Sequence, residues 1–226
     1  MTPAELAVLC LVYFATSVVS VVTGATSLII VPVLLSFGVE PRTALATNML
    51  ALVWLSARAT EIFFRGGEIE RRHLPSLLAL AFIGSVVGAL VVFAIPPNLI
   101  RAVVAVAMLT VGFAVLYPLS EDYPPWVETP ARATSYAVTF LLAIYGGFFS
   151  GEYVTILTAA WVFLLHVPFK HAVATTKLAN LVSSLAAVAV FAARGTIDWR
   201  LGALLSVSAF LGAMLGARWT LRLNET

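Results

Sequence analysis

The fold is decided first by LAVLCLVYFATSVVSVVTGATSLIIVPVLLSF, the stretch from Leu6 to Phe37. It is apolar along most of its 32 residues and is broken around Thr23-Gly24-Ala25. As one continuous helix it would be ~48 Å long, whereas the hydrocarbon core of a bilayer is only ~30 Å thick. We therefore predict a broken hairpin, whose two helical arms enter and leave on the same side of a membrane and meet near its midplane.

A second stretch of this kind runs from Thr134 to Leu165 and is broken around Gly146-Gly147 and Ser150-Gly151-Glu152. A helix break inside lipid leaves N–H and C=O groups unpaired, which is tolerated only where protein or a water-filled cavity satisfies them. Both breaks therefore predict cavities. The second arms are expected to begin near Thr26 and Thr155, so that their N-terminal N–H groups and positive dipole ends suit an anion at the midplane.

The composition supports a membrane protein over the whole chain. Hydrophobic residues make up 61% of the 226 residues and charged residues 11%, against about a quarter charged in an ordinary soluble domain. There is room for roughly seven spans of about 20 residues, and the long apolar runs lack the alternation of barrel strands. The predicted fold class is an all-α polytopic membrane protein in a lipid bilayer, and we expect the N-terminal segment to remain in the mature protein.

Charge and cysteine content exclude other classes. The formal net charge is +2 and the basic residues are scattered over the loops, so no nucleic-acid partner is expected. Cys10, the single cysteine, cannot form a disulfide framework or a cysteine metal site. His166, Lys170 and His171 are interpreted as a loop cluster, and a metal role with further ligands is left open. We expect no metal and no cofactor.

The two halves of the sequence carry the same landmarks in the same order. Each half has a threonine-containing helix, then a loop that begins Arg-Gly, and then a helix with two glycines four residues apart. The landmarks are ALATNML (Ala44–Leu50), RGGEIERR (Arg65–Arg72) and Gly84 with Gly88 in the first half, and VATTKLA (Val173–Ala179), RGTIDWR (Arg194–Arg200) and Gly212 with Gly216 in the second. In this alignment Thr47 corresponds to Thr176. The glycine pairs are expected to bring helices close together.

Residues 1–117 are predicted to form the first membrane repeat, 118–131 an acidic, Pro-rich linker loop and 132–226 the second repeat. The second repeat has no counterpart of the helix at 99–117, which we expect to be absent or to follow residue 226. A hairpin plus three crossings would invert the second repeat relative to the first. The inverted arrangement divides the basic loop residues seven to four, which favours the richer side as cytoplasmic.

Several motifs resemble those of the sulfite exporter TauE/SafE family. They are the Gly-broken opening segment with Pro32, ALATN (Ala44–Asn48), YGGFFSGEY (Tyr145–Tyr153) and ATTKLANLVSS (Ala174–Ser184). The resemblance covers essentially the whole chain and implies a multi-pass protein of the bacterial inner (plasma) membrane that moves sulfite, organosulfonates or related anions. The glycine clusters at TGATS and SGEYVT are poorer than the family's usual pattern, which leaves the substrate open.

Polar residues inside the predicted helices indicate a site for that anion. Lys177 would be costly in a span unless it faces the protein interior or a cavity, so we expect its ammonium to be the counter-charge of the substrate. Snorkelling to the near membrane surface is the alternative. Glycines at the breaks would permit sharp turns and close backbone approach. The expected substrate-binding residues are Gly24, Thr26, Ser27, Thr47, Asn48, Gly147, Ser150, Gly151, Thr155, Thr176, Lys177 and Asn180.

Two acidic residues are given different roles. Glu152, beside the second break, would be costly while ionised, so it is expected either to carry a coupling proton or to cap the arm that follows it. Arg58 and Glu61 are three residues apart on one helix and are expected to form a structural ion pair. A role for that pair in the transport pathway is the alternative.

The leading hypothesis is a secondary transporter, and specifically an exporter, of a small sulfur-containing anion such as sulfite or an organosulfonate. It would work by alternating access at a midplane site, with a proton or another cation as the coupling ion; a homodimer is left open. The sequence has no G-x-x-x-x-G-K-[ST] phosphate loop, which argues against ATP hydrolysis. The alternatives are an anion channel and an intramembrane enzyme, although Ser150 has no evident histidine base in its own segment. We therefore expect no enzymatic activity.

Overall fold

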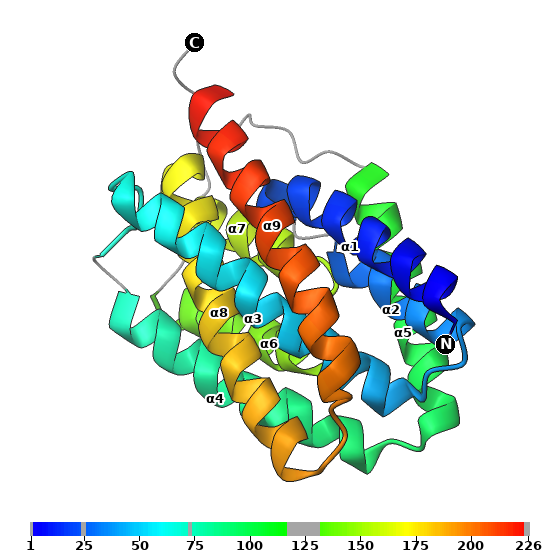
Figure 1. Ribbon diagram of the computed structural model, residues 1–226. Coiled ribbons are helices and arrows are strands. Elements are labelled where there is room, and N and C mark those ends of the chain that lie inside the picture. Colours follow the sequence, from blue (N-terminus) through cyan, green and yellow to red (C-terminus); the bar gives the residue numbers. More distant parts are fainter. Residues whose placement is uncertain (1, 24–25, 72–73, 117–131, 224–226) are drawn as a thin grey trace.

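A computed structural model describes residues 2–23, 26–71, 74–116 and 132–223 (Figure 1). Within these ranges the chain forms nine α-helices and no β-strand, which confirms the all-α class. The helices are α1 (Pro3–Thr23), α2 (Thr26–Ser36), α3 (Pro41–Arg65), α4 (Leu74–Ala94), α5 (Pro97–Leu116), α6 (Arg132–Phe148), α7 (Tyr153–Leu165), α8 (Phe169–Ala193) and α9 (Trp199–Leu223). The predicted linker at 118–131 lies outside the described residues.

Four helical segments of the described chain are long and apolar enough to cross a membrane. They are Pro3–Val21, Leu74–Ala94, Phe169–Ala193 and Trp199–Thr220. The arms α2, α6 and α7 are apolar but shorter than 18 residues, and α3, although it has 25 residues, carries Arg58, Glu61 and two further arginines. The length of the chain leaves room for roughly seven spans, of which four are recognised by length and composition among the described residues.

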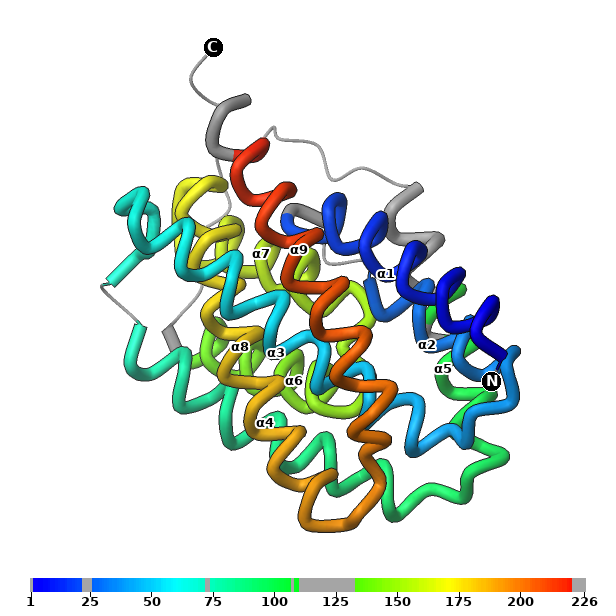
Figure 2. The backbone as a smooth tube through the Cα atoms, in the orientation of Figure 1, coloured from blue at the N-terminus to red at the C-terminus, as the bar shows by residue number. Residues whose placement is uncertain are grey.

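The two halves interlock through their fourth helices. α3 and α8 pack against each other, α9 packs on α1 and α3, and α4 packs on α6 and α8. Figure 2 shows this arrangement as a backbone tube, with α3, α8 and α9 crossing the middle of the view. Exchanging α1–α4 for α6–α9 leaves these pairs unchanged, so the fourth helix of each half packs on the first and third helices of the other half.

α3 and α8 run in opposite directions. Three hydrogen bonds mark their course: Asp198 N–H to Thr47 Oγ1 (3.2 Å), Asn180 Nδ2 to Ser56 Oγ (2.8 Å) and Glu70 N–H to Thr175 Oγ1 (2.9 Å). As the residue number rises from 47 to 70 on the α3 side, the number of the bonded residue falls from 198 to 175 on the α8 side. Opposite directions of corresponding helices are what an inverted repeat requires; the placement of each loop on a membrane face stays a prediction.

The loops that follow α3 and α8 fix the register between the halves. Gly67 and Gly195 both have a positive φ, of 71° and 65°, a conformation that glycine adopts at no steric cost. Each terminates the preceding helix in the same way, with its N–H donated to a carbonyl three residues back. Corresponding residues of the two halves are therefore 128 positions apart.

This register changes one pairing of the sequence alignment. Glu70 of the first loop donates its N–H to Thr175, and Asp198 of the second loop donates its N–H to Thr47. Thr47 thus corresponds to Thr175 and not to Thr176. The alignment is one residue off because two adjacent threonines fit the same motif equally well.

The glycine pairs of α4 and α9 allow close helix packing, as expected. Gly84 and Gly88 lie against α6, and Gly212 and Gly216 lie against α1. A Cβ atom at Gly88 would be 1.9 Å from the carbonyl oxygen of Ile144, and one at Gly216 would be 2.1 Å from that of Val18. No side chain larger than hydrogen fits at these positions without moving a helix.

The broken segments fold back as hairpins. In α7, Trp161 Nε1 donates to Thr139 Oγ1 of α6 at 3.1 Å, and Ser135 Oγ donates to Leu164 O at 3.3 Å, so α7 returns along α6. α2 likewise packs on α1 (Figure 1). The first hairpin is unequal, because α1 has 21 residues and α2 has 11. At ~31 Å, α1 is long enough to cross a bilayer alone, whereas the predicted hairpin has both arms meet near the midplane.

Candidate functional site

The second helix break is built from strained backbone. Between α6 and α7, Ser150 and Glu152 have φ of 62° and 56°, in the left-handed region that costs a non-glycine residue on the order of 1–3 kcal/mol. Gly151 supplies space instead, because a Cβ atom there would lie 2.3 Å from the Phe149 ring and 2.9 Å from Leu28 of α2. The second break therefore lies directly against the first hairpin.

Gly146 and Gly147 lie inside α6 and not in the break where they were expected. A Cβ atom at Gly147 would be 2.3 Å from the carbonyl oxygen of Ser85 in α4, and one at Gly146 would be 2.8 Å from the Tyr153 ring. Both glycines allow close packing of α6 against its neighbours. The break begins only after Phe148, where α6 ends.

The first helix break is described by its two edges, since Gly24 lies outside the described residues. α2 begins at Thr26, as expected, and Thr26 Oγ1 donates a hydrogen bond to Ser20 Oγ in the last turn of α1. Both side chains are buried. The end of α1 and the start of α2 are thus joined by a pair of hydroxyl groups.

Asn48 of α3 holds the start of α2. Its Nδ2 donates to Ser27 Oγ at 2.9 Å, and its Oδ1 accepts from the Tyr13 hydroxyl at 3.0 Å. All three side chains are buried. Asn48 therefore connects the two arms of the first hairpin to the central helix α3.

Lys177 lies where the two broken segments meet. It is in α8, its side chain is fully buried, and its Nζ donates to the carbonyl oxygen of Ser20 at 2.6 Å. Its ammonium also interacts electrostatically with Glu152 of the second break. Lys177 does not snorkel; it faces the protein interior, as expected of an ionisable residue inside a membrane protein.

Glu152 is the negative group at the second break. Among the described residues, Glu152 and Lys177 are the two charged side chains that are buried. Glu152 precedes the first residue of α7, but its carboxylate makes no capping hydrogen bond to the α7 backbone. Instead Glu152 Oε2 accepts from Thr155 Oγ1 at 2.6 Å. The geometry therefore does not favour the capping role that the sequence left open for Glu152.

Asn180 connects the second break to both central helices. Its Oδ1 accepts from Ser150 Oγ at 3.4 Å, and its Nδ2 donates to Ser56 Oγ of α3 at 2.8 Å. Asn180 lies three residues after Lys177, so both side chains project from one face of α8. The cluster of buried polar groups therefore extends from Tyr13 to Ser56.

Two of the expected site residues make their contacts elsewhere. Thr47 accepts the Asp198 N–H of the loop after α8, and Thr176 shares a hydrogen bond of 2.8 Å with Thr158 of α7. Both bonds lead away from Lys177 and Glu152. The roles of Thr47 and Thr176 in substrate binding stay predictions, while their observed roles are to join helices and loops.

Three residues of the cluster were missed by sequence reasoning: Tyr13, Ser20 and Ser56. Tyr13 and Ser20 are seven residues apart in α1, so they lie on one face of that helix. This polar stripe in an apolar helix is a signal that the sequence does contain. Ser56 carries no such signal, because its contact with Asn180 depends on how α3 and α8 are rotated.

The remaining charges lie nearer the ends of the helices. Arg58 and Glu61 form the expected ion pair, and Arg65 also contacts Glu61, at 2.7 Å. Lys170 contacts Glu68 at 2.8 Å, so the members of the expected loop cluster that lie at the start of α8 hold the loop after α3. Among the described residues, the ion-pair contacts of these groups do not include the residues of the buried cluster.

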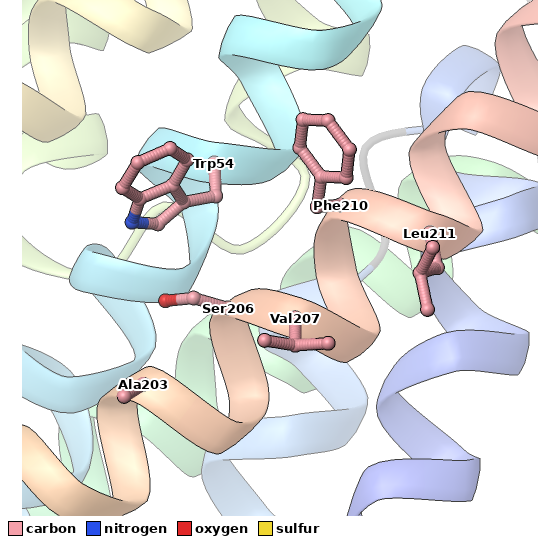
Figure 3. Close-up of a pocket in the computed structure, with 6 residues that line it drawn as sticks. All are labelled: Trp54, Ala203, Ser206, Val207, Phe210 and Leu211. Atoms are coloured by element: carbon pink, nitrogen blue, oxygen red, sulfur yellow. The ribbon is translucent and has the colours of Figure 1, made fainter.

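An apolar groove opens on the outer face of α3 and α9. Figure 3 shows Trp54 of α3 beside the residues of α9 that line it. The lining residues are Trp54, Ala203, Ser206, Val207, Phe210 and Leu211. Trp54 and Val207 are 50% and 61% exposed, so the groove lies on the outer surface of the helices and is not the polar site described above.

The chain matches the sulfite exporter TauE/SafE family over residues 9–226. The chain belongs to the sulfite exporter TauE/SafE family. As a TauE/SafE protein whose described part has four helices suited to span a bilayer, it is a multi-pass protein of the bacterial inner membrane and a membrane transporter of this family's type. No solved structure gives a significant match.

Relatives of this TauE/SafE protein are found in several bacteria. A probable membrane transporter protein of Haemophilus influenzae is 30% identical over 222 residues, which cover 98% of this chain and 87% of the relative. The probable membrane transporter protein YfcA of Escherichia coli strain K12 is 28% identical, with 97% and 82% covered. The probable membrane transporter protein YdhB of Bacillus subtilis is 22% identical, with 87% and 82% covered.

Proposed function

We propose that the chain is a secondary transporter that exports a small sulfur-containing anion such as sulfite or an organosulfonate. The observation that carries the proposal is the buried ammonium of Lys177, which lies at the end of one broken helix and interacts with the break of the other. An uncompensated charge in a low-dielectric interior is costly, and one ordinary use of such a charge is to bind an ion of opposite sign.

The surroundings of Lys177 favour an anion over a cation or a neutral solute. α2 begins at Thr26, and Thr26 contacts the same residue, Ser20, that accepts the Lys177 hydrogen bond. The first N–H groups of a helix have no partner within the helix and form its positive end. An oxyanion placed between these N–H groups and Lys177 would receive charge-assisted hydrogen bonds from both. Ser27 lies in the first turn of α2, and Thr155 lies in the first turn of α7, the arm that follows the second break.

We further propose that transport proceeds by alternating access between inverted repeats. The interlocked packing of α4 and α9 supports this, because each half holds the other while the breaks meet between them. Rocking of one half against the other would open the site to one membrane face at a time. In this scheme Glu152 carries a coupling proton, because it is the carboxylate nearest to the proposed anion charge.

Two other functions are less well supported. An anion channel would need a continuous pore, whereas Lys177 is fully buried. An intramembrane hydrolase would need a base beside Ser150, but the contact of Ser150 Oγ in the described structure is the amide oxygen of Asn180. The relatives are named as membrane transporters, and no catalytic role is proposed.

The test is transport by the purified protein in liposomes. Efflux of sulfite, thiosulfate, sulfate and sulfoacetate, and of the zwitterionic sulfonate taurine, should be compared with that of acetate and chloride. A secondary transporter should show saturable flux with a preference for at least one sulfur-containing anion. Flux that rises linearly with concentration would indicate a channel, and flux of none of these anions would remove the proposed substrate class.

A further inference from the structure

The C-terminal end of α1 is expected to attract a cation. The last carbonyl groups of a helix lack partners within the helix, and Ser20 lies in the last turn of α1, which ends at Thr23. They form the negative end of the helix. In transporters with broken helices, such carbonyl ends coordinate the coupling Na⁺ or H⁺, while the N-terminal ends of the following arms face the anionic substrate.

The groups around this end are oxygen ligands of the kind that a hard cation takes. They are the carbonyl oxygen of Ser20 and the hydroxyls of Ser20 and Thr26. Carbonyl, hydroxyl and carboxylate oxygens are the ligands preferred by hard metal cations. In this structure the position is taken by Lys177 Nζ, 2.6 Å from Ser20 O.

At the end of α6, Phe149 N–H and Ser150 N–H both donate to the carbonyl oxygen of Tyr145, at 2.9 and 3.5 Å. By the 128-residue register, Met49 stands in the first half where Lys177 stands in the second. The ammonium is therefore specific to one of the two breaks.

We propose that the Lys177 ammonium permanently occupies the coupling-cation position of this transporter, so that the protein neither binds nor requires Na⁺. A second cation at the same oxygens would be repelled by the ammonium and would find Ser20 O already engaged. The inference rests on the proposed transport function, and it assigns Lys177 a second role beside that of contacting the anion. A covalently attached cation cannot leave with the substrate, so Na⁺ coupling through this position is excluded.

The test compares Na⁺ with other monovalent cations on the full-length protein in detergent. The parent chain should bind ²²Na⁺ without saturation and should have the same thermal unfolding midpoint in NaCl, KCl and choline chloride. Lys177→Ser removes the ammonium and leaves room and a further hydroxyl. It should gain saturable ²²Na⁺ binding and a midpoint at least ~2 °C higher in NaCl than in choline chloride at Na⁺ concentrations well above the dissociation constant.

Lys170→Ser is the matched control, since it removes the same charge from the partly exposed Lys170–Glu68 pair and should show no Na⁺ effect. Saturable Na⁺ binding by the parent chain would overturn the inference, whether or not the variants fold. Lys177→Ala, which also removes the charge and leaves room at Ser20 O, serves if Lys177→Ser does not fold. A folded Lys177 variant that still ignores Na⁺ would also overturn it. Neither result would change the anion flux measured with the parent chain. The proposed anion transport and the proposed role of Lys177 at the cation position can therefore be rejected independently.

Discussion

Lys177 engages one of its three N–H donors in the described contacts, the bond to Ser20 O. An ammonium has three donors and no acceptor, so two donors remain for groups that enter the site. Replacing one partner of a buried charged pair costs on the order of 3–5 kcal/mol of stability. Variants at this position must therefore be checked for folding before their binding is interpreted.

Lys177→Gln is expected to weaken binding of the transported anion. Loss of a charge-assisted hydrogen bond costs about 1.5–3 kcal/mol, which corresponds to a roughly ten- to hundredfold rise in Kd. Isothermal titration of the detergent-purified variant with sulfite, or with whichever anion the liposome test selects, measures the change. Arg101→Gln, at an exposed position near the start of α5, should bind as the parent does. Equal affinity of parent and Lys177→Gln would place the anion elsewhere.

Glu152→Gln is expected to remove the pH dependence of transport. The carboxylate accepts a hydrogen bond from Thr155 and, with Lys177, is one of the two buried charged groups of the described residues. Gln keeps the hydrogen bond but cannot exchange a proton. Initial rates in liposomes from about pH 5.5 to about pH 8.5, on both sides of neutrality, test this, with Glu5→Gln as a control. An unchanged pH profile would rule out a coupling role for Glu152.

Individual side-chain contacts were the least predictable from the sequence. Lys177, Asn48 and Asn180 could be picked out, because polar residues inside apolar helices are costly and need partners. Their actual partners could not, since Ser20 and Ser56 are reached only once the rotation of α1, α3 and α8 about their axes is known. A pattern of polarity gives the face of a helix, not its neighbour.

Helix breaks were predicted well in position and less well in cause. The polar stretch SGE ends α6 and begins α7 as the sequence indicates, but the residues at positive φ are Ser150 and Glu152 rather than glycine. Gly147 was assigned to the turn because glycine usually permits one, whereas it packs against α4. Composition alone does not separate a glycine that bends the chain from one that lets two helices approach.

Gly88→Ala is expected to loosen the contact between α4 and α6. The added Cβ atom would lie 1.9 Å from Ile144 O, and overpacking of a well-packed site costs about 1–3 kcal/mol. The thermal unfolding midpoint in detergent should fall by several degrees. Gly66→Ala is the control, because its Cβ atom would be 3.5 Å from its nearest neighbours and its φ is −76°. Equal midpoints for the two variants would show that the close approach does not limit stability.

The overall arrangement follows from the interlocking of the halves. Landmarks such as Gly84 with Gly88 and Gly212 with Gly216 predicted two similar halves, and their spacing is the 128-residue register of the structure. The sequence could not show that α4 and α9 each pack on helices of the other half, because the apolar surface of a helix does not specify which helix it contacts.

The inverted topology is tested by labelling cysteines from each side of the membrane. In a Cys10→Ala background, Arg65→Cys and Arg200→Cys are both exposed at the ends of their helices. A membrane-impermeant maleimide added outside intact cells should label only one of them, and opening the cells should reveal the other. Labelling of both from the same side would contradict inverted repeats.

Because α4 packs on helices of the second half, it is synthesised before its packing partners exist. α4 finds its packing partners α6 and α8 in the second half of the chain, and its Ser85 hydroxyl bonds to Ser183 of α8. At roughly 5–20 residues per second, the roughly fifty residues that separate the end of α4 from the end of α6, on which the α4 glycines pack, take on the order of 3–10 s to make. During that interval the nascent α4 lies in lipid with its glycine face uncovered, so a ribosome that stalls there leaves a helix open to capture by insertases or membrane proteases.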